Sequence, residues 1–173
     1  MEQTSRRFSR VKTRLKIRFR PTYADAMPLF LGCVDCSSKP DLSSVKSNYL
    51  PQELLDFLSH MDNKLDLILS FFSQKDVEQD YPGAGEIIEI SGAGLRFSTD
   101  QKIEPGEYLE AAIFLSSLPP VVIGVVGKII RKEELHNKAV YAFEYVNIRE
   151  SDREQIVQFV FKEQRELLRE QRL

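Results

Sequence analysis

The sequence predicts a mainly β protein, a small antiparallel barrel with one long inserted helix and one helix at the end of the chain. Three patterns indicate this fold: short runs of alternating apolar and polar residues between turn signals, a helical segment with a heptad rhythm, and a final amphipathic helix. A chain of 173 residues is long enough for one buried core and a small addition. We therefore expect one barrel domain that an insertion interrupts.

The first strand is expected at Val11–Arg20. Apolar and basic residues alternate there, so one face of the strand should be buried and the other positively charged. Pro21 is expected to end the strand. The segment Arg6 to Arg20 contains eight Lys or Arg and no Asp or Glu, although the chain has a net charge of −2. The basic character is therefore local to this end of the chain.

A long helix is expected at about residues 51–73, within an insertion that spans 22–81. Pro51 suits the first turn, and Glu53 lies near the positive end of the helix dipole. Apolar residues then recur in steps of four and three, the rhythm of a coiled-coil seam. The seam residues are Leu54, Leu58, Met61, Leu65, Ile68 and Phe72. Further apolar residues lie beside the seam and widen this surface. The wide apolar surface favours self-association of the helix, with packing on its own barrel as the alternative.

The remaining strands are expected in the second half of the chain. Two of them form a hairpin around a Ser-Gly-Ala-Gly turn, and three more follow, separated by Pro-Gly, Pro-Pro and charged turns. Their expected bounds are Glu86–Ile90, Leu95–Ser98, Tyr108–Leu115, Val121–Arg131 and Ala139–Val146. Five to seven short antiparallel strands of this kind favour a small barrel over a parallel sheet.

The final helix should begin near Ser151, which forms a capping box with Glu154. Its apolar stripe consists of Ile156, Phe159, Val160 and Leu167. The stripe predicts a helix that packs on another surface, either the barrel or an oligomer interface, and the sequence leaves both open.

The composition excludes several classes of protein. Hydrophobic residues make up 42% and charged residues 29% of the chain, as in a soluble globular protein. No run of about 18 apolar residues predicts a membrane span, and the basic N-terminus lacks the apolar stretch of a secretory signal. We therefore expect a cytoplasmic protein. Nucleic-acid binding through the basic first strand remains a minor alternative, because the strand has few aromatic residues and the chain is acidic.

Catalytic and metal sites are not expected. Cys33 and Cys36 have C-x-x-C spacing, which permits a redox or zinc site. Ordinary reduced cysteines are favoured, because His60 and His136 are distant in the sequence and no other ligand pattern accompanies the pair. The sequence has no Ser-His-Asp order, P-loop or metal triad. We expect a non-enzymatic protein without a metal or cofactor.

Two short motifs carry the binding chemistry. The first is Arg6-Arg7-Phe8-Ser9-Arg10, whose guanidinium groups could bind phosphate oxygens and stack on flat rings; a solvated basic tail is the alternative. The second is Glu89-Ile90-Ser91-Gly92-Ala93-Gly94, in which a hydroxyl and backbone N–H groups could face a ligand. An ordinary hairpin turn needs the same residues and is the alternative for the second motif.

Together the motifs resemble those of the PilZ domain, a family of bacterial receptors for cyclic di-GMP. Arg6 and Arg10 match the family's R-x-x-x-R motif, with Arg7 beside them. Ser91 and Gly94 match its D/N-x-S-x-x-G motif. The resemblance covers about residues 5–21 and 85–170. It implies a six-stranded antiparallel PilZ-like barrel built from 1–21 and 82–173.

The resemblance also implies how a ligand would be held. The three arginines of the first motif would clamp the phosphates of cyclic di-GMP and stack on guanine, closing as an arm over the ligand. Ser91, Gly94 and Glu89 would contact the ligand from the barrel. Closure of the arm would change a surface that an unidentified downstream protein recognises.

The sequence departs from the usual family pattern in two places. Glu89 stands where the family has Asp or Asn, and its longer side chain moves the carboxylate by more than an ångström. The insertion between the first two strands resembles that of the tetrameric PilZ subgroup, which implies a homo-oligomer such as a tetramer. Both departures also suit an alternative function, a ligand-independent oligomeric scaffold that binds protein partners.

Overall fold

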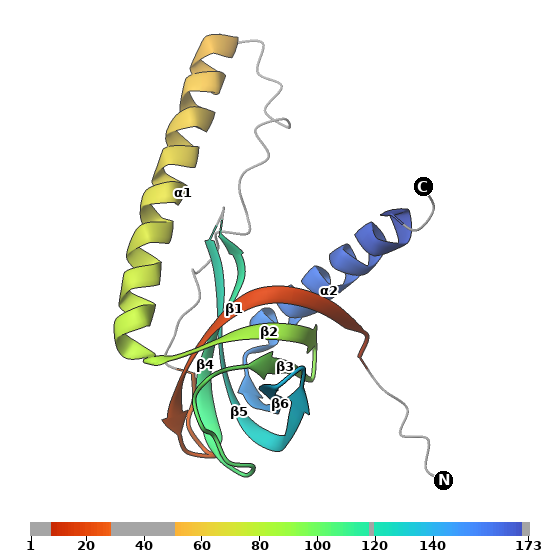
Figure 1. Cartoon of the computed structure of the whole chain (residues 1–173). Coiled ribbons are helices and arrows are strands. Elements are labelled where there is room, and N and C mark those ends of the chain that lie inside the picture. Colours follow the sequence, from red (N-terminus) through yellow and green to blue (C-terminus); the bar gives the residue numbers. More distant parts are fainter. Residues whose placement is uncertain (1–7, 29–50, 118–119, 171–173) are drawn as a thin grey trace.

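The computed structural model describes residues 8–28, 51–117 and 120–170, apart from the side chains of 66–67, 69–76 and 120. In this part of the chain six antiparallel strands close into a barrel, from which two helices project (Figure 1). The strands are β1 (Arg10–Thr22), β2 (Gly83–Ser91), β3 (Gly94–Ser98), β4 (Tyr108–Ser117), β5 (Pro120–Leu135) and β6 (Lys138–Ile148). The helices are α1 (Gln52–Asp80) and α2 (Glu150–Glu170). The expected fold class is confirmed.

The strands follow the order β1-β2-β3-β6-β5-β4, and β1 closes the barrel by pairing with β4. Most strands extend beyond their predicted ends. Pro21 lies inside β1 instead of ending it, paired with Leu109 of β4. The pairing of β1 with β2 ends at Phe19, so Pro21 has a neighbouring strand on one side only. A proline is tolerated at such a position because no neighbouring strand needs a hydrogen bond from the N–H that proline lacks.

Aromatic rings fill the interior of the barrel. The Phe97 ring lies 5.4 Å from that of Phe19, 5.8 Å from that of Tyr141 and 6.3 Å from that of Phe143, measured between centroids. Phe97 is fully buried, as the alternation of apolar and polar residues in β3 requires. The residues between the buried ones therefore point outward, and they form the outer surface on which the site lies.

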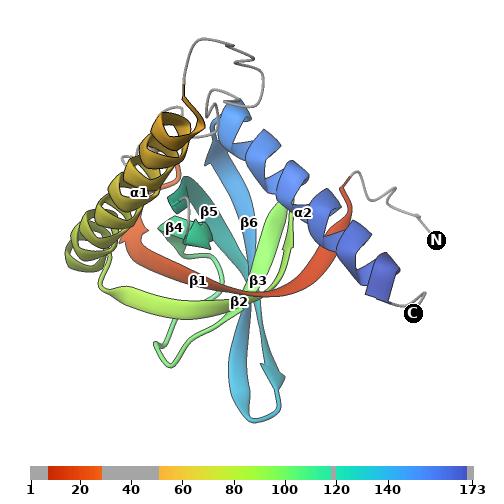
Figure 2. The ribbon, with the colours of Figure 1, turned by 90° about the horizontal axis from the view of Figure 1, so that it is seen from above.

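The first half of α2 packs on the barrel. Ile156 and Val160 are buried in the same core as the barrel residues, and Figure 2 shows α1 and α2 on different sides of the barrel. Leu167, expected in the apolar stripe, is instead 44% exposed, because the helix has left the barrel by that point. Ser151 is not the cap, since the helix already begins at Glu150.

One turn and one irregularity in the strand pairing explain how β5 and β6 pack. His136 and Asn137 join the strands with positive φ angles of 51° and 60°, so His136 serves a hairpin turn. Gly127 lies at an irregularity of the β5–β6 pairing, as expected for a bend. A Cβ atom there would come within 2.4 Å of the Glu144 carbonyl oxygen, so the close approach of the two strands requires glycine.

Helix α1 continues to Asp80, beyond its predicted end at about 73. Its last turn is anchored to the barrel by Val77 and Tyr81, which pack with Ala112 and Val122 in a second small core. Arg18 of β1 also donates a 2.8 Å hydrogen bond to Glu78. The helix thus meets the barrel at its C-terminal end and extends away from it (Figure 1).

A buried charged group, here called the base cluster (Arg20, Tyr81 and Glu110), reinforces this anchor. Arg20 donates two hydrogen bonds of 2.9 and 2.8 Å to one oxygen of Glu110, and the Tyr81 hydroxyl donates a 2.8 Å bond to the other. The Arg20 guanidinium also lies 4.7 Å from the centroid of the Tyr81 ring. Burial raises the pKa of Tyr81, so its hydroxyl stays a donor.

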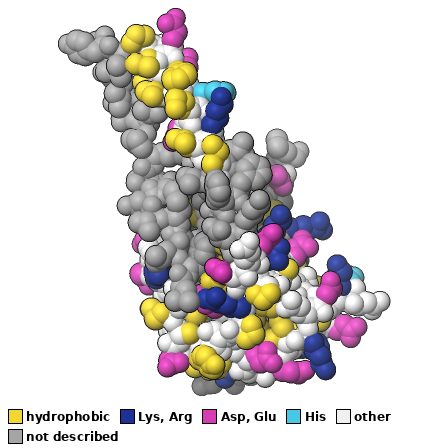
Figure 3. All heavy atoms as spheres, turned by 90° about the vertical axis from the view of Figure 1, so that its left-hand side faces the viewer, with side chains coloured by type: hydrophobic (Ala, Val, Ile, Leu, Met, Phe, Trp, Pro, Cys, Tyr) yellow, Lys and Arg dark blue, Asp and Glu magenta, His cyan; other side chains and the backbone are white. Residues whose placement is uncertain are grey.

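The predicted seam of α1 is exposed in the single chain. The exposed fractions of its described side chains lie between 40% for Leu54 and 54% for Leu65. The described seam side chains are Leu54, Leu58, Met61, Leu65 and Ile68; the side chain of Phe72 is outside the description. Hydrophobic side chains gather on the distal part of the helix (Figure 3). At these described seam positions the helix does not pack on its own barrel.

Candidate ligand-binding site

The two predicted motifs meet at one edge of the barrel. Arg10, the first residue of β1, is paired with Ser91, the last residue of β2. Its guanidinium donates a 3.2 Å hydrogen bond to Glu89, and its carbonyl oxygen accepts a 3.0 Å bond from Gln164 of α2. Arg6 and Arg7 lie outside the described residues, as do Cys33 and Cys36. The structure therefore brings the last arginine of the first motif against the second motif.

Phe8 fixes the start of the described chain on the β2–β3 turn. A Cβ atom at Gly92 would lie 2.6 Å from the Phe8 ring, so glycine allows the ring to rest on the turn. Arg153 of α2 donates a 2.6 Å hydrogen bond to the Gly92 carbonyl, and its guanidinium lies 5.9 Å from the centroid of the Phe8 ring. The sequence predicted neither contact. The position of Phe8 within the arginine motif is a signal that could have indicated an apolar contact holding the motif to the barrel.

Ser91 and Gly94 are engaged in the turn itself. The Ser91 hydroxyl donates a 3.0 Å hydrogen bond to the Gly94 carbonyl and accepts a 3.3 Å bond from the Ala93 N–H. Ser91 is only 4% exposed. A Cβ atom at Gly94 would lie 2.4 Å from the Phe143 carbonyl oxygen of β6. The turn therefore uses the Ser91 hydroxyl, and the close approach of β3 to β6 requires glycine at Gly94.

Alternating charges extend the site across the barrel. Glu89 also accepts a 3.3 Å hydrogen bond from Arg96 of β3. Arg96 in turn donates to Glu133 of β5, which accepts a further bond from Arg131. The Arg131 hydrogen bond lowers the pKa of Glu133. We call this set the arginine row (Arg10, Glu89, Arg96, Glu133 and Arg131).

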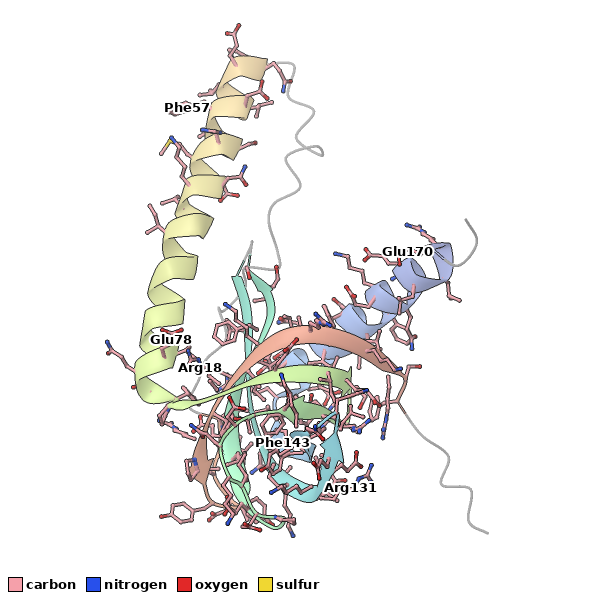
Figure 4. All side chains as sticks on the ribbon, in the orientation of Figure 1. Arg18, Phe57, Glu78, Arg131, Phe143 and Glu170 are labelled. Atoms are coloured by element: carbon pink, nitrogen blue, oxygen red, sulfur yellow. The ribbon has the colours of Figure 1, made fainter. Side chains whose placement is uncertain are left out.

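The arginine row borders a hollow of about 220 Å³. Residues from five strands and the β2–β3 turn line it: Arg10, Glu89, Ile90, Ser91, Ala93, Gly94, Leu95, Arg96, Ile130, Arg131, Ala142, Phe143 and Glu144. Arg131 lies on the part of the barrel away from α1 (Figure 4). The hollow is thus open, lined by both polar and apolar residues, and remote from the seam. All described residues of the predicted binding set, Arg10, Glu89, Ser91 and Gly94, lie at it.

The PilZ domain family model matches residues 70–162, which is more than half of the sequence. The chain belongs to the PilZ domain family. The match covers β2 to β6 and most of α2, so Glu89, Ser91 and Gly94 lie within it and Arg10 lies before it. None of the curated proteins shows significant similarity to this PilZ protein.

Solved structures share the PilZ fold at low sequence identity. The inhibitor of motility of Bacillus subtilis is 13% identical, with a TM-score of 0.54 over 93% of this chain and 52% of that one. The present chain thus spans about half the length of that protein. A tetrameric PilZ domain from Xanthomonas campestris, self-assembled through a helical bundle, is 16% identical, with a TM-score of 0.55 over 92% and 89% of the two chains.

The described residues also bear on metal, membrane and nucleic-acid sites. No group of three or more potential metal ligands occurs among the residues that the structure describes. No helix in that part of the chain is long and apolar enough to cross a membrane. The basic face of β1 is largely compensated, since Arg14, Arg18 and Arg20 each have an acidic partner within 3.8 Å. This pairing gives a basic nucleic-acid surface little support.

Proposed function

We propose that this PilZ protein is a non-enzymatic receptor for cyclic di-GMP, which binds over the hollow beside the β2–β3 turn. One observation carries the proposal: Arg10 and the Glu89–Gly94 motif, distant in sequence, form the wall of a single open hollow. Guanidinium groups beside backbone N–H groups suit the phosphates of a dinucleotide.

In this proposal the residues of the two motifs share the ligand. Arg6, Arg7 and Arg10 clamp the phosphates and stack on guanine, while Glu89, Ser91 and Gly94 form the barrel side of the contact. Part of the binding free energy is spent on ordering the arm. The contacts of Phe8 and Arg10 with the turn and α2 give the arm a defined base. The closed arm would then present a surface to a downstream protein.

Isothermal titration with cyclic di-GMP tests the receptor function. The wild-type protein should bind saturably. Arg10→Ala should lose binding, because it removes a phosphate-binding guanidinium group from the edge of the hollow. Arg18→Ala is the matched control, since Arg18 is another paired arginine of β1, at the base of α1. Equal loss of binding in the two variants would contradict the proposed site.

We also propose that residues 1–21 and 82–173 form the PilZ barrel domain and that the insertion, 22–81, makes the protein a homo-oligomer such as a tetramer. The exposed seam of α1 supports this, because large apolar side chains in a row are rarely left in water. The helical bundle of the Xanthomonas relative shows that the fold is compatible with such an assembly. The site and the seam would then act separately.

The oligomer can be tested by measuring mass in solution. Leu58→Glu with Leu65→Glu places two charges in the seam and should reduce the mass to that of a single chain. Asn63→Glu adds a charge to an exposed position of α1 outside the predicted seam and should leave the mass unchanged. An assembly that withstands the double substitution would exclude the seam as its interface.

A second candidate function is a ligand-independent scaffold that binds protein partners. It is favoured because the polar groups of the second motif are already hydrogen-bonded within the protein. The Ser91 hydroxyl is used within the turn, and both Glu89 oxygens accept hydrogen bonds from arginines. Absence of cyclic di-GMP binding from a folded oligomer would select this function.

A further inference from the structure

We infer that Arg96 and Arg131 are further ligand-binding residues, which form a phosphate subsite on β3 and β5. In the unbound protein Glu89 and Glu133 occupy this subsite in place of the ligand's phosphates. The inference rests on the proposed function, because it assigns residues outside both motifs to the same cyclic dinucleotide.

Strand register places these residues together. Glu89 is paired with Arg96, Arg96 with Ala142, and Ala142 with Arg131 across β2, β3, β6 and β5. Directly paired residues of neighbouring antiparallel strands point to the same face. Leu95 and Phe97 are buried, so that face is the outer one. The two arginines therefore flank Ala142, whose short side chain leaves the space of the hollow between them.

The electrostatics of the hollow are balanced internally. Three guanidinium groups, of Arg10, Arg96 and Arg131, line it, as do the carboxylates of Glu89 and Glu144. Glu133 adds a carboxylate through its bonds to Arg96 and Arg131. An anionic ligand therefore binds well only if carboxylates leave the arginines to it.

The acidic partners can be exchanged because the row is open to water. The side chains of Arg131 and Glu133 are 60% and 32% exposed, and those of Arg96 and Glu89 are 26% and 19% exposed. Partly exposed ion pairs contribute less to stability than fully buried ones. Phosphate oxygens accept two parallel bonds from one guanidinium as a carboxylate does. In addition, the buried Nε of Arg96 has no hydrogen-bond partner among the described residues. This N–H is covered in the unbound protein, so a phosphate reaches it only after a neighbouring carboxylate has moved away.

Titration of the whole 173-residue chain with cyclic di-GMP tests the subsite, through one variant that should gain affinity and others that should lose it. Glu133→Gln should tighten binding several-fold, because it removes a competing negative charge. Glu134→Gln is the matched control: it removes the same charge from the next residue of β5, whose side chain points to the opposite face of the strand, and should bind as the wild type does. Misfolding cannot produce a gain in affinity. A tighter complex in Glu133→Gln therefore cannot be explained by a misfolded variant.

Arg131→Ala and Arg96→Lys should each weaken binding by about tenfold or more, the scale of a lost charge-assisted hydrogen bond. Arg14→Ala, which removes a 90% exposed arginine of β1, should not. Unchanged affinity in Arg131→Ala and Glu133→Gln, with binding lost in Arg10→Ala, would overturn the subsite and leave the receptor function intact. A wild-type protein that does not bind cyclic di-GMP would overturn both.

Discussion

The base cluster and the arginine row are built from the same chemistry and differ in the burial of their carboxylates. In the base cluster the Glu110 side chain is 3% exposed, and both of its oxygens accept hydrogen bonds. In the arginine row the side chains of Glu89 and Glu133 are 19% and 32% exposed. One set lies under the end of α1, and the other borders an open hollow.

This difference shows how one kind of pair can serve two purposes. A buried carboxylate cannot lose its partner without a large desolvation cost, so the base cluster holds α1 to the barrel. A partly exposed carboxylate can turn to water at a lower cost, so the arginine row can release its arginines to another anion. Burial, not residue type, separates a structural ion pair from a replaceable one.

The largest expected effect comes from breaking the base cluster. Glu110→Gln leaves Arg20 without its buried counter-charge and should lower the free energy of unfolding by about 3 kcal/mol. Tyr81→Phe removes one hydrogen bond to the same carboxylate and should lower it by about 1.5 kcal/mol. Urea unfolding measures both. A change below about 0.5 kcal/mol in Glu110→Gln would mean that burial does not distinguish the two clusters.

A much smaller effect is expected from the arginine row. Glu133→Gln should change the free energy of unfolding by less than about 1 kcal/mol at neutral pH. Because the folded-state pKa of Glu133 lies below its ordinary value of 4.5, its contribution is present above that pH. The contribution is lost as the pH falls through the lower folded-state pKa. Unfolding at pH 7 and pH 3 should therefore show the variant converging on the wild type in acid, and a difference that grows in acid would contradict the ion pair.

Much of the fold follows from the sequence, because alternation of apolar and polar residues, apolar runs and turn signals together identified all six strands. The end of α1 did not follow. Residues 73–80 are polar except for Val77, so their periodicity is weak. They remain helical where Val77 and Tyr81 dock on Ala112 and Val122, a tertiary contact that no local pattern contains.

The candidate site was predictable in part. Arg10 and Glu89 lie at the hollow as the motifs suggested, but the roles of Ser91 and Gly94 stayed ambiguous, because a tight turn and a ligand contact need the same residues. Arg96 could have been placed on the outer face from the alternation Leu-Arg-Phe. Arg131 could not have been placed beside it, since that requires knowing that β6 lies between β3 and β5.

The most direct test measures cyclic di-GMP binding and unfolding on the same two variants, Arg10→Ala and Tyr81→Phe. We expect opposite outcomes: Arg10→Ala keeps the wild-type unfolding midpoint and loses binding, whereas Tyr81→Phe unfolds earlier and binds as the wild type does. Binding that survives in Arg10→Ala, at an unchanged midpoint, would contradict the claim that the hollow at the start of β1 is the receptor site.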